Sequence, residues 1–232
     1  MIAKNGGAEF NPYLFEKQLI ENVDRQIRIF EHTEATEIVK LKNGYKVITN
    51  YSIEIKCKKI ICTTGYNTAL FTKKELCTKF VSYTITSEKF KDKLWQNREL
   101  LQDNSTPYHY MRLSDDNRLI IGGEDTILKG DRIKDKKAEK KYKKLKKFAI
   151  NMFPELKNAS FEYEFCGLFS STTNNLSIVG TLEEDEGIFY NLGYGANGIL
   201  YSIYGAQNIV KLLKNEKIDD CLKFISPNLT IK

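Results

Sequence analysis

The sequence predicts an α+β fold in which mainly antiparallel sheets are covered by helices, and three observations support this class. Segments of alternating apolar and polar residues follow one another across short turns, as in half-buried hairpins. Apolar residues at helical spacing are confined to three segments, near 12–25, 129–153 and 199–213. Only one glycine turn, at 193–198, links a strand directly to a helix. The regular strand–helix alternation of a parallel sheet is therefore not predicted.

The first helix is predicted to begin at Asn11-Pro12, because Asn can cap a helix and Pro suits its first position. The alternation that follows the helix, at 26–30, predicts a short strand. One buried helix face up to about Arg25 is predicted from apolar residues at steps of three and four, namely Leu14, Phe15, Leu19, Ile20 and Val23.

Four strands are predicted next, and the first three form an antiparallel meander. Asn43-Gly44 between two alternating segments is the strongest short hairpin signal and sets the first turn. The fourth strand is apolar and is expected to be fully buried. The predicted strands span 35–41, 45–49, 53–57 and 59–63.

Alternating strands dominate the chain from about residue 75 onward. A hairpin turn is predicted at 114–117 and an acidic loop at 183–186, while 222–225 is the last segment that could form a strand. The strands are predicted at 80–86, 108–113, 118–122, 161–165, 176–180 and 187–192.

A lysine-rich helix is predicted within 129–153, and Pro154 ends it. Its lysines occupy most of the surface, which favours a solvated helix face over a nucleic-acid-binding patch. Its apolar residues fall on one stripe that is expected to be buried: Tyr142, Leu145, Phe148, Ala149 and Met152.

The composition is that of a globular protein with a sizeable core: of 232 residues, 41% are hydrophobic and 28% charged. The net charge is +6, but lysine is frequent throughout, so no nucleic-acid partner is predicted. No apolar segment approaches the roughly 20 residues needed to span a bilayer. The N-terminus also lacks a signal pattern. No membrane span is expected, and the predicted location is cytoplasmic.

The cysteines and histidines predict no metal site. His32 and His109 lie far apart, with no cysteine or carboxylate at ligand spacing, so both are expected to be structural. The cysteines form an odd set without a C-x-x-C pair and are predicted to be free thiols: Cys57, Cys62, Cys77, Cys166 and Cys221.

The segment from Gly193 to Ile199 is the strongest candidate binding element. Its three glycines allow a tight turn and a close backbone approach to a ligand, and the free N–H groups of the following helix favour an anion. The spacing also matches G-x-G-x-x-G. Too few residues follow Gly198 for a full βαβ unit, so a Rossmann start is not predicted.

Six stretches of the sequence, taken in order, resemble one family, the FAD-dependent oxidoreductases of the D-amino-acid oxidase type. The similarity is with the C-terminal part of these proteins, in the glycine oxidase, sarcosine oxidase and gamma-glutamylputrescine oxidase branches. Each stretch alone is a loose match, but together they cover nearly the whole chain. The stretches are 11–13, 61–67, 110–124, 153–156, 167–180 and 192–199.

The resemblance implies three parts. Residues 1–75 would form a partial FAD-binding domain with the three-stranded meander and the buried strand. Residues 76–175 would form the substrate domain on an antiparallel sheet. Residues 176–232 would return to the FAD-binding domain with the flavin loop and the C-terminal helix.

The resemblance also implies which residues bind the cofactor. Ala35 falls where the main chain meets the adenine, and Thr64 and Gly65 fall on the pyrophosphate side. The helix start in the flavin loop would stabilise negative charge at the N1–C2=O edge of the reduced ring, with Asn197 expected to cap that helix. The residues that face the ring are Gly193, Gly195, Ala196, Asn197, Gly198 and Ile199.

Tyr110 and Arg112 are the implied substrate contacts, although a surface ion pair of Arg112 with Asp115 or Asp116 is the alternative. The implied reaction oxidises the C–N bond of a small amine or amino acid by hydride transfer to FAD. The protein supplies orientation and charge, so no catalytic acid or base is identified. Leu200 stands where the sarcosine branch has a lysine for the substrate carboxylate, which favours a plain amine.

The largest departure of the sequence from the family is the lack of the family's N-terminal half. The family begins with a half that carries its true G-x-G-x-x-G, and without this half the pyrophosphate would lose its helix N-terminus. FAD is therefore expected in the complete enzyme but not in this chain alone, which is expected to be inactive. The implied partner is a separate N-terminal flavin-binding half, or a second copy bound through apolar surface near Ile60-Ile61. Cys166 lies beside the covalent attachment position of some sarcosine oxidases, so no covalent flavin link is expected.

Two other hypotheses remain. The first is a non-catalytic remnant or subunit that acts by binding a partner chain, which a native start at Met1 would favour. The second is a basic nucleic-acid-binding module that uses the lysines of 129–147. It predicts steeply salt-dependent binding and is the least favoured.

Overall fold

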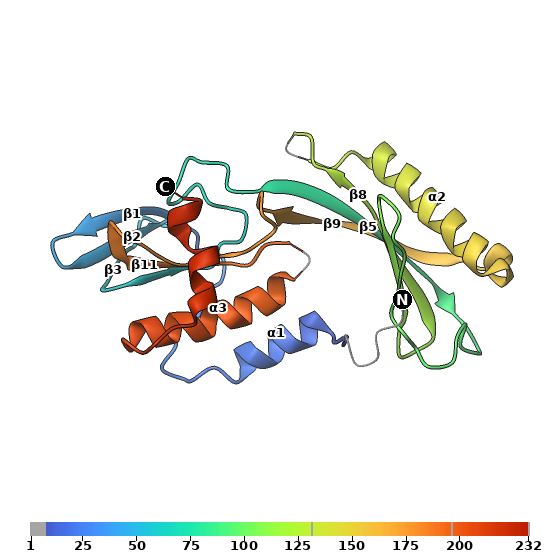
Figure 1. The fold of residues 1–232 in the computed structure, drawn as a ribbon, viewed down its shortest axis with the longest axis horizontal. Helices are drawn as coiled ribbons and strands as arrows, with labels where there is room; N and C mark the ends of the chain where they lie inside the picture. Colours follow the sequence, from blue (N-terminus) through green and yellow to red (C-terminus); the bar gives the residue numbers. More distant parts are fainter. Residues whose placement is uncertain (1–7, 131, 196, 232) are drawn as a thin grey trace.

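A computed structural model describes residues 8–130, 132–195 and 197–231. Figure 1 shows two lobes, with strands β5 (Thr78–Lys89) and β9 (Phe161–Ser171) reaching from one into the other. Both lobes combine mostly antiparallel sheet with helix. The predicted α+β class is confirmed.

In the described part of the chain, the first lobe holds two three-stranded sheets and two α-helices. Strands β1, β2 and β3 form the predicted antiparallel meander, and the second sheet has the order β10-β11-β4, in which β4 is parallel to β11. Helices α1 and α3 lie in this lobe (Figure 1). The bounds are α1 Pro12–Glu21, β1 Ala35–Leu41, β2 Gly44–Thr49, β3 Glu54–Cys57, β4 Ile60–Cys62, β10 Ile178–Leu182, β11 Asp185–Leu192 and α3 Gly198–Leu213.

The second lobe is a five-stranded antiparallel sheet of order β6-β7-β8-β5-β9 with one helix, α2, on one face. Tyr83, Ile121 and Leu145 are fully buried between this sheet and α2. The opposite face is open enough that Tyr163 and Phe165 are more than half exposed. The remaining bounds are β6 Leu101–Gln102, β7 His109–Leu113, β8 Arg118–Ile127 and α2 Asp135–Met152, with 3₁₀ turns at Pro154–Asn158, Asp220–Ile225 and Pro227–Leu229.

Local sequence signals placed several elements correctly. Asn11 is the N-cap of α1, and its side chain accepts a hydrogen bond from Leu14 N at 3.1 Å. The first hairpin forms, although its two-residue loop is Lys42-Asn43, one residue before the predicted turn. The predicted α2 stripe is buried at Leu145 and Ala149, which are inaccessible.

Other expectations were wrong. The segment 26–30 is irregular and exposed rather than a strand, because among the described residues nothing pairs with it. Helix α1 ends at Glu21 and has no buried residue, and the groove between it and α3 is open. Strand β4 is not fully buried: among the described residues it lies at the edge of its sheet, and Ile61 is 49% exposed. The segment 222–225 lies in a 3₁₀ helix, and Met152 at the end of the α2 stripe is 51% exposed.

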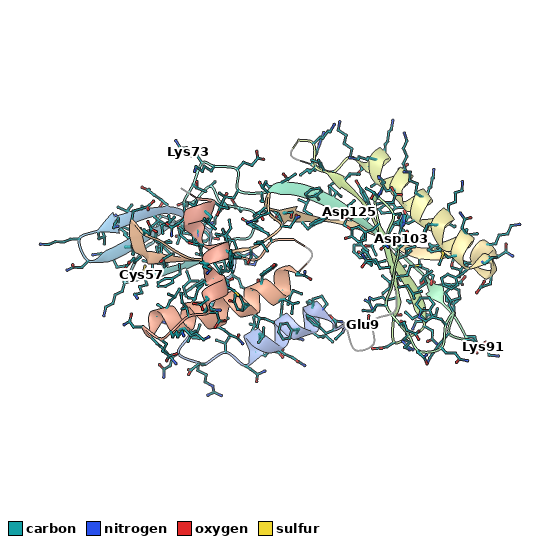
Figure 2. The ribbon with its side chains drawn as sticks, viewed as in Figure 1. Glu9, Cys57, Lys73, Lys91, Asp103 and Asp125 are labelled. Atoms are coloured by element: carbon teal, nitrogen blue, oxygen red, sulfur yellow. The ribbon has the colours of Figure 1, made fainter. Side chains whose placement is uncertain are left out.

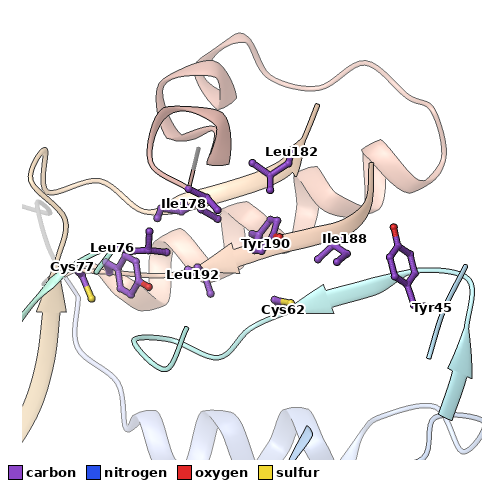
Figure 3. Packing of buried hydrophobic residues seen from close by; sticks show 11 residues of the cluster. Tyr45, Cys62, Leu76, Cys77, Ile178, Leu182, Ile188, Tyr190 and Leu192 are labelled. Atoms are coloured by element: carbon purple, nitrogen blue, oxygen red, sulfur yellow. The ribbon is translucent and has the colours of Figure 1, made fainter. Parts of the chain in front are cut away.

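Tyr45 anchors the meander to the second sheet of the first lobe. Its ring packs against Gly187, and its hydroxyl donates to the carboxylate of Asp185, which Lys40 also contacts at 3.2 Å. Burial and the Asp185 carboxylate together raise the pKa of Tyr45 to about 12. Figure 3 shows Tyr45 at one end of a core that continues through Ile188 and Tyr190. The two sheets of this lobe therefore share one core.

The five cysteines, all described, are free thiols. Within the described part of the chain, no helix has both the length and the apolar character needed to cross a membrane. The same residues contain no group of three or more histidine, cysteine or carboxylate side chains arranged to hold a metal ion.

Candidate functional site

Three segments far apart in the sequence meet at the glycine loop before α3. Gly195 N donates to Ser170 O at 2.7 Å, at the end of β9. The side chain of Tyr194 is buried, and its hydroxyl donates to Gly65 O at 2.8 Å. The loop, the end of β9 and the turn after β4 are therefore fixed to one another.

The glycines of this loop differ in what surrounds them. A Cβ at Gly193 would lie 2.6 Å from both Gly198 O and Ser202 Oγ, so this position is packed against the start of α3. Gly195 has φ +75°, a left-handed conformation that side chains rarely adopt. A Cβ there would have no heavy atom of the described residues closer than 3.7 Å. Position 193 needs glycine for packing, and position 195 needs it for its backbone conformation.

Among the described residues, no side chain caps the N-terminus of α3. Asn197 occupies the N-cap position, but its φ of −103° and ψ of 24° are not the extended values of a capping residue. Its side chain makes no capping hydrogen bond, so the expectation that Asn197 caps the helix was wrong. The first N–H groups of α3 remain available to a negatively charged group. Gly198 is the first residue of α3, Ile199 beside it is 38% exposed, and Ala196 lies outside the described residues.

The other predicted cofactor residues are distributed over two places. Thr64 and Gly65 lie in the turn that Tyr194 holds against the glycine loop. Ala35 lies at the start of β1, opposite Thr49 in the meander, and the hydrogen bonds of the described residues do not link it to the loop. The structure thus brings Thr64 and Gly65 to the loop and leaves Ala35 in a separate sheet.

Tyr110 and Arg112 lie on the open face of the five-stranded sheet. Their neighbours on β7, Met111 among them, are buried against α2, and successive side chains of a strand point to opposite faces. The Tyr110 ring lies over Gly122, where a Cβ would collide with it, and its hydroxyl is 3.5 Å from Thr84 Oγ1. This face therefore presents an aromatic ring, a hydroxyl and a guanidinium.

The ion pair of Arg112 is not the one considered from the sequence. Its Nη1 lies 3.3 Å from Glu9 Oε2, and both side chains are about 40% exposed (41% and 40%). Asp115 and Asp116 contact other cations, at Arg98, Lys89 and Arg118. Figure 2 places Glu9 between the two lobes, beside the sheet. The segment before α1 therefore reaches the open face.

One charged cluster was missed by sequence reasoning. His109, for which no carboxylate at ligand spacing was found, lies 2.8 Å from Asp103 and 3.5 Å from Glu124. Burial raises the pKa of Asp103, but hydrogen bonds from His109 and Ser105 outweigh it and hold the pKa at about 2. The signal in the sequence that could have indicated this cluster is Gly122-Gly123. A bulge follows these glycines in β8, and the Glu124 side chain there contacts Lys141 of α2.

The Tyr194 contact predicts a measurable cost. We expect Tyr194→Phe to lower the free energy of unfolding by about 1 kcal/mol, because the part-buried Gly65 carbonyl loses its donor. Urea unfolding followed by circular dichroism measures this. Tyr13→Phe is the matched control, since that ring is 70% exposed on α1. Equal unfolding midpoints for the two variants would contradict the prediction.

Comparison with known proteins gives a family-model match. The model described as DAO, FAD dependent oxidoreductase, matches residues 3–212. Gamma-glutamylputrescine oxidoreductase of Escherichia coli K12 is 31% identical over 107 residues, which are 46% of this chain and 23% of that protein. The probable oxidoreductase OrdL of Haemophilus influenzae is 26% identical over 188 residues, covering 76% of this chain and 40% of that protein.

Solved structures share the fold. Glycine oxidase from Geobacillus kaustophilus superposes with a TM-score of 0.69 at 19% identity, over 84% of this chain and 52% of that one. This chain thus spans about half of that solved structure and less than half of the two curated proteins it matches.

Proposed function

The chain belongs to the DAO family of FAD-dependent oxidoreductases, and from this premise we propose that it is the C-terminal part of an enzyme that oxidises the C–N bond of a small amine or amino acid. The observation that carries the proposal is the junction at Tyr194, which holds Gly65 against the glycine loop. The family roles assigned to these segments require them to be neighbours, and they are 129 residues apart in the sequence.

The residues present fit the ring side of a flavin. The loop offers an open glycine surface at Gly195 and the uncapped N-terminus of α3. Both suit a flat ring with a polar, electron-rich edge. We assign Gly193, Gly195, Asn197, Gly198 and Ile199 to this edge, and Ala196 by its place in the sequence.

FAD, when bound, supplies the hydride-accepting chemistry of such an enzyme. This chain's own residues would orient the substrate and the ring. We propose that Thr64 and Gly65 approach the cofactor from the turn held by Tyr194, and that Ala35 meets the adenine from the meander. We assign no acid–base role to any side chain.

The open face of the five-stranded sheet would receive the substrate. Tyr110 offers a ring and a hydroxyl, and Arg112 offers a guanidinium whose present partner, Glu9, is half-exposed and exchangeable. A substrate with a carboxylate would have to displace Glu9 from Arg112. A plain amine would not, and Leu200, 67% exposed on α3, adds no cation for a carboxylate.

We propose that the chain needs a partner to hold FAD firmly. Among the described residues strand β4 pairs with β11 alone, so its other edge can accept a strand. We propose a separate N-terminal flavin-binding half at this edge, or a second copy of the chain. The five free thiols favour a reducing, cytoplasmic location.

A flavin titration tests the function. We expect the purified chain to be colourless after gel filtration, yet to quench flavin fluorescence weakly at high concentration. FMN should bind with nearly the same affinity as FAD. The loop is proposed to contact the flavin ring, which both cofactors share, and Ala35 is the one residue assigned to the adenine, which FMN lacks. Tight retention of FAD, or ADP competing as well as FMN, would contradict the assignment of the loop. No interaction with any flavin would favour the alternative, a non-catalytic subunit that only binds another chain.

Exposed apolar surface predicts self-association of the chain alone. Leu14 on α1 and Leu200 on α3 are at least half exposed, and they line an apolar groove of about 400 Å³ between the two helices. We expect sedimentation velocity to show concentration-dependent association that Leu200→Ser weakens. Leu229→Ser, at a position 64% exposed near the C-terminus, is the control. A clean monomer at high concentration would contradict this.

A further inference from the structure

One carboxylate of the second lobe is left without a cation. The Oδ1 atom of Asp125, on β8, is inaccessible to solvent and has no hydrogen-bond partner among the described residues. No ion pair of these residues includes Asp125 either. A buried carboxylate oxygen without a donor is unfavourable, so a bound cation would be stabilising there. Several other carboxylates of this lobe do contact a lysine or an arginine: Asp115, Asp116, Glu124 and Glu162.

Asp125 belongs to the open face of the five-stranded sheet. A β-bulge in β8 sets two successive residues, Glu124 and Asp125, opposite Ser82 of β5. The Glu124 side chain contacts α2 through Lys141, whereas Asp125 interacts with the hydroxyl of Tyr108. Burial and the nearby Asp125 carboxylate raise the pKa of Tyr108 to about 12, so this hydroxyl keeps its proton. Figure 2 shows Asp125 in the second lobe, towards the first.

Aromatic rings border this carboxylate. The rings of Tyr108 and Tyr110 lie side by side on the open face, with centroids 6.2 Å apart. Phe80 stacks on Phe169 at 5.2 Å, and it lies two residues from Ser82, on the same face of β5. The faces of aromatic rings attract cations, as the carboxylate does. The surroundings of the carboxylate therefore suit an alkylammonium ion, which has a charged head and an apolar stem.

Small residues leave room beside the carboxylate. Ser82 pairs with Gly167 of β9, and a Cβ added at Gly167 would have no heavy atom of the described residues within 4 Å. Gly167 is three residues before Ser170, the residue that accepts from Gly195 of the glycine loop. Three residues of a strand span about 10 Å. The open space is therefore separated from the glycine loop by about the length of a small, extended ligand.

The reacting nitrogen of a substrate would not suit this position. Hydride loss from the carbon beside an amine uses the lone pair of the nitrogen, which an ammonium ion lacks. A carboxylate stabilises the charged form of a bound amine. A cation held at Asp125 would therefore belong to an end of the substrate that does not react.

On the basis of the function proposed above, we propose that Asp125, Tyr108 and Tyr110 form a cation subsite that binds the ammonium group at the non-reacting end of the substrate. The substrate is then an amine that carries a second, non-reacting ammonium group. The torsion that exchanges the two oxygens of an aspartate is broad, so either oxygen of Asp125 can meet this group. The tyrosine rings pack against its stem.

Amide NMR of the unmodified chain tests the subsite. Pentylamine, an ammonium ion at neutral pH, is titrated into the nitrogen-15-labelled chain, and 1-pentanol is the uncharged probe of similar length. We expect pentylamine to shift the amide signals of 108–110 and 124–126 until they saturate. Pentanol should bind about tenfold more weakly, because it makes neither the ion pair nor the cation–π contact. Equal affinities, or shifts confined to other segments, would overturn the proposal.

A pair of variants shows whether the charge of Asp125 is responsible. Asp125→Asn keeps the shape of the side chain and removes its charge, so it should weaken pentylamine binding about tenfold. Asp115→Asn makes the same change at a fully exposed side chain of the same lobe and should leave the affinity unchanged. Equal affinities of the two variants would contradict the proposal. If Asp125→Asn does not fold, the comparison of the two probes in the unmodified chain decides.

A diamine distinguishes the non-reacting end from the reacting one. In the chain completed by a flavin-binding half, Asp125→Asn should raise KM for 1,5-diaminopentane about tenfold more than KM for pentylamine. Equal increases for the two amines would mean that Asp125 binds the reacting nitrogen, and the proposal would be wrong.

The subsite and the proposed function can fail separately. Pentylamine bound at Asp125 in a chain that binds no flavin would overturn the proposed function and leave the cation site in place. Flavin binding without any response of 124–126 to pentylamine would overturn the subsite alone.

Discussion

Gly195→Val is expected to abolish flavin retention in a protein that completes this chain with a flavin-binding half, whereas Asn197→Ser should keep most of it. Gly195 has φ +75°, and a β-branched residue in this region is strained by about 1–3 kcal/mol. The loop would relieve that strain by moving, and its N–H donation to Ser170 O would be lost. Valine would also place a bulky side chain on the surface assigned to the ring.

Asn197 is the matched control for this experiment. It lies two residues away in the same loop and is exposed, and its side chain makes no capping hydrogen bond. Serine there removes nothing that the helix uses. Bound FAD per chain, measured by absorbance after gel filtration, compares the variants. Equal retention would show that the loop does not lie against the ring, and the proposed placement of the flavin would then fail.

The elements predicted correctly are those whose signals are local. The Asn11 side chain caps α1 because Asn, Pro and the following apolar residues are adjacent in the sequence. The first hairpin was predicted from Asn43-Gly44 between two alternating segments, and it forms with its loop one residue earlier, at Lys42-Asn43. In each case the deciding hydrogen bonds join residues that are a few positions apart, so the sequence pattern contains both partners.

The predictions that failed depend on partners elsewhere in the chain. The apolar face of α1 has the spacing of a buried helix, yet burial requires a surface to pack against, and α3 covers only part of it. His109 lies beside Glu124 because β7 pairs with β8 in one register, with a bulge after Gly123. The spacing of apolar residues within one strand does not show which residue of the neighbouring strand lies opposite, so this contact could not be predicted.

The junction at Tyr194 shows how far the candidate site could be predicted from the sequence. Tyr194 lies between two glycines in the sequence, but its burial and its acceptor, Gly65 O, 129 residues away, are seen only in the structure. The family resemblance placed both segments beside the cofactor without naming this hydrogen bond. The structure adds the hydrogen bond that joins the two segments, which neither the sequence nor the resemblance predicted.

Leu145→Ala is expected to give the largest loss of stability among the changes considered, about 2–5 kcal/mol in the free energy of unfolding. Leu145 is fully inaccessible, and it packs with Tyr83 and Ile121 under α2. Truncation removes buried methyl groups and leaves a cavity that the sheet cannot fill by collapsing. Because α2 is the one helix on this face of the five-stranded sheet within the described residues, the loss should weaken the whole second lobe.

Met152→Ala is the control that makes this result specific to burial. Both residues belong to the apolar stripe predicted for the same helix, and both changes keep good helix formers. Met152 is 51% exposed at the last turn of α2, so its truncation should change the free energy of unfolding by less than about 0.5 kcal/mol. Urea unfolding of the two variants tests the difference. The free energies of unfolding are compared with the same dependence on urea concentration for both variants. Similar losses would mean that α2 packs on the sheet through its C-terminal turn, and that the core centred on Leu145 is wrongly placed.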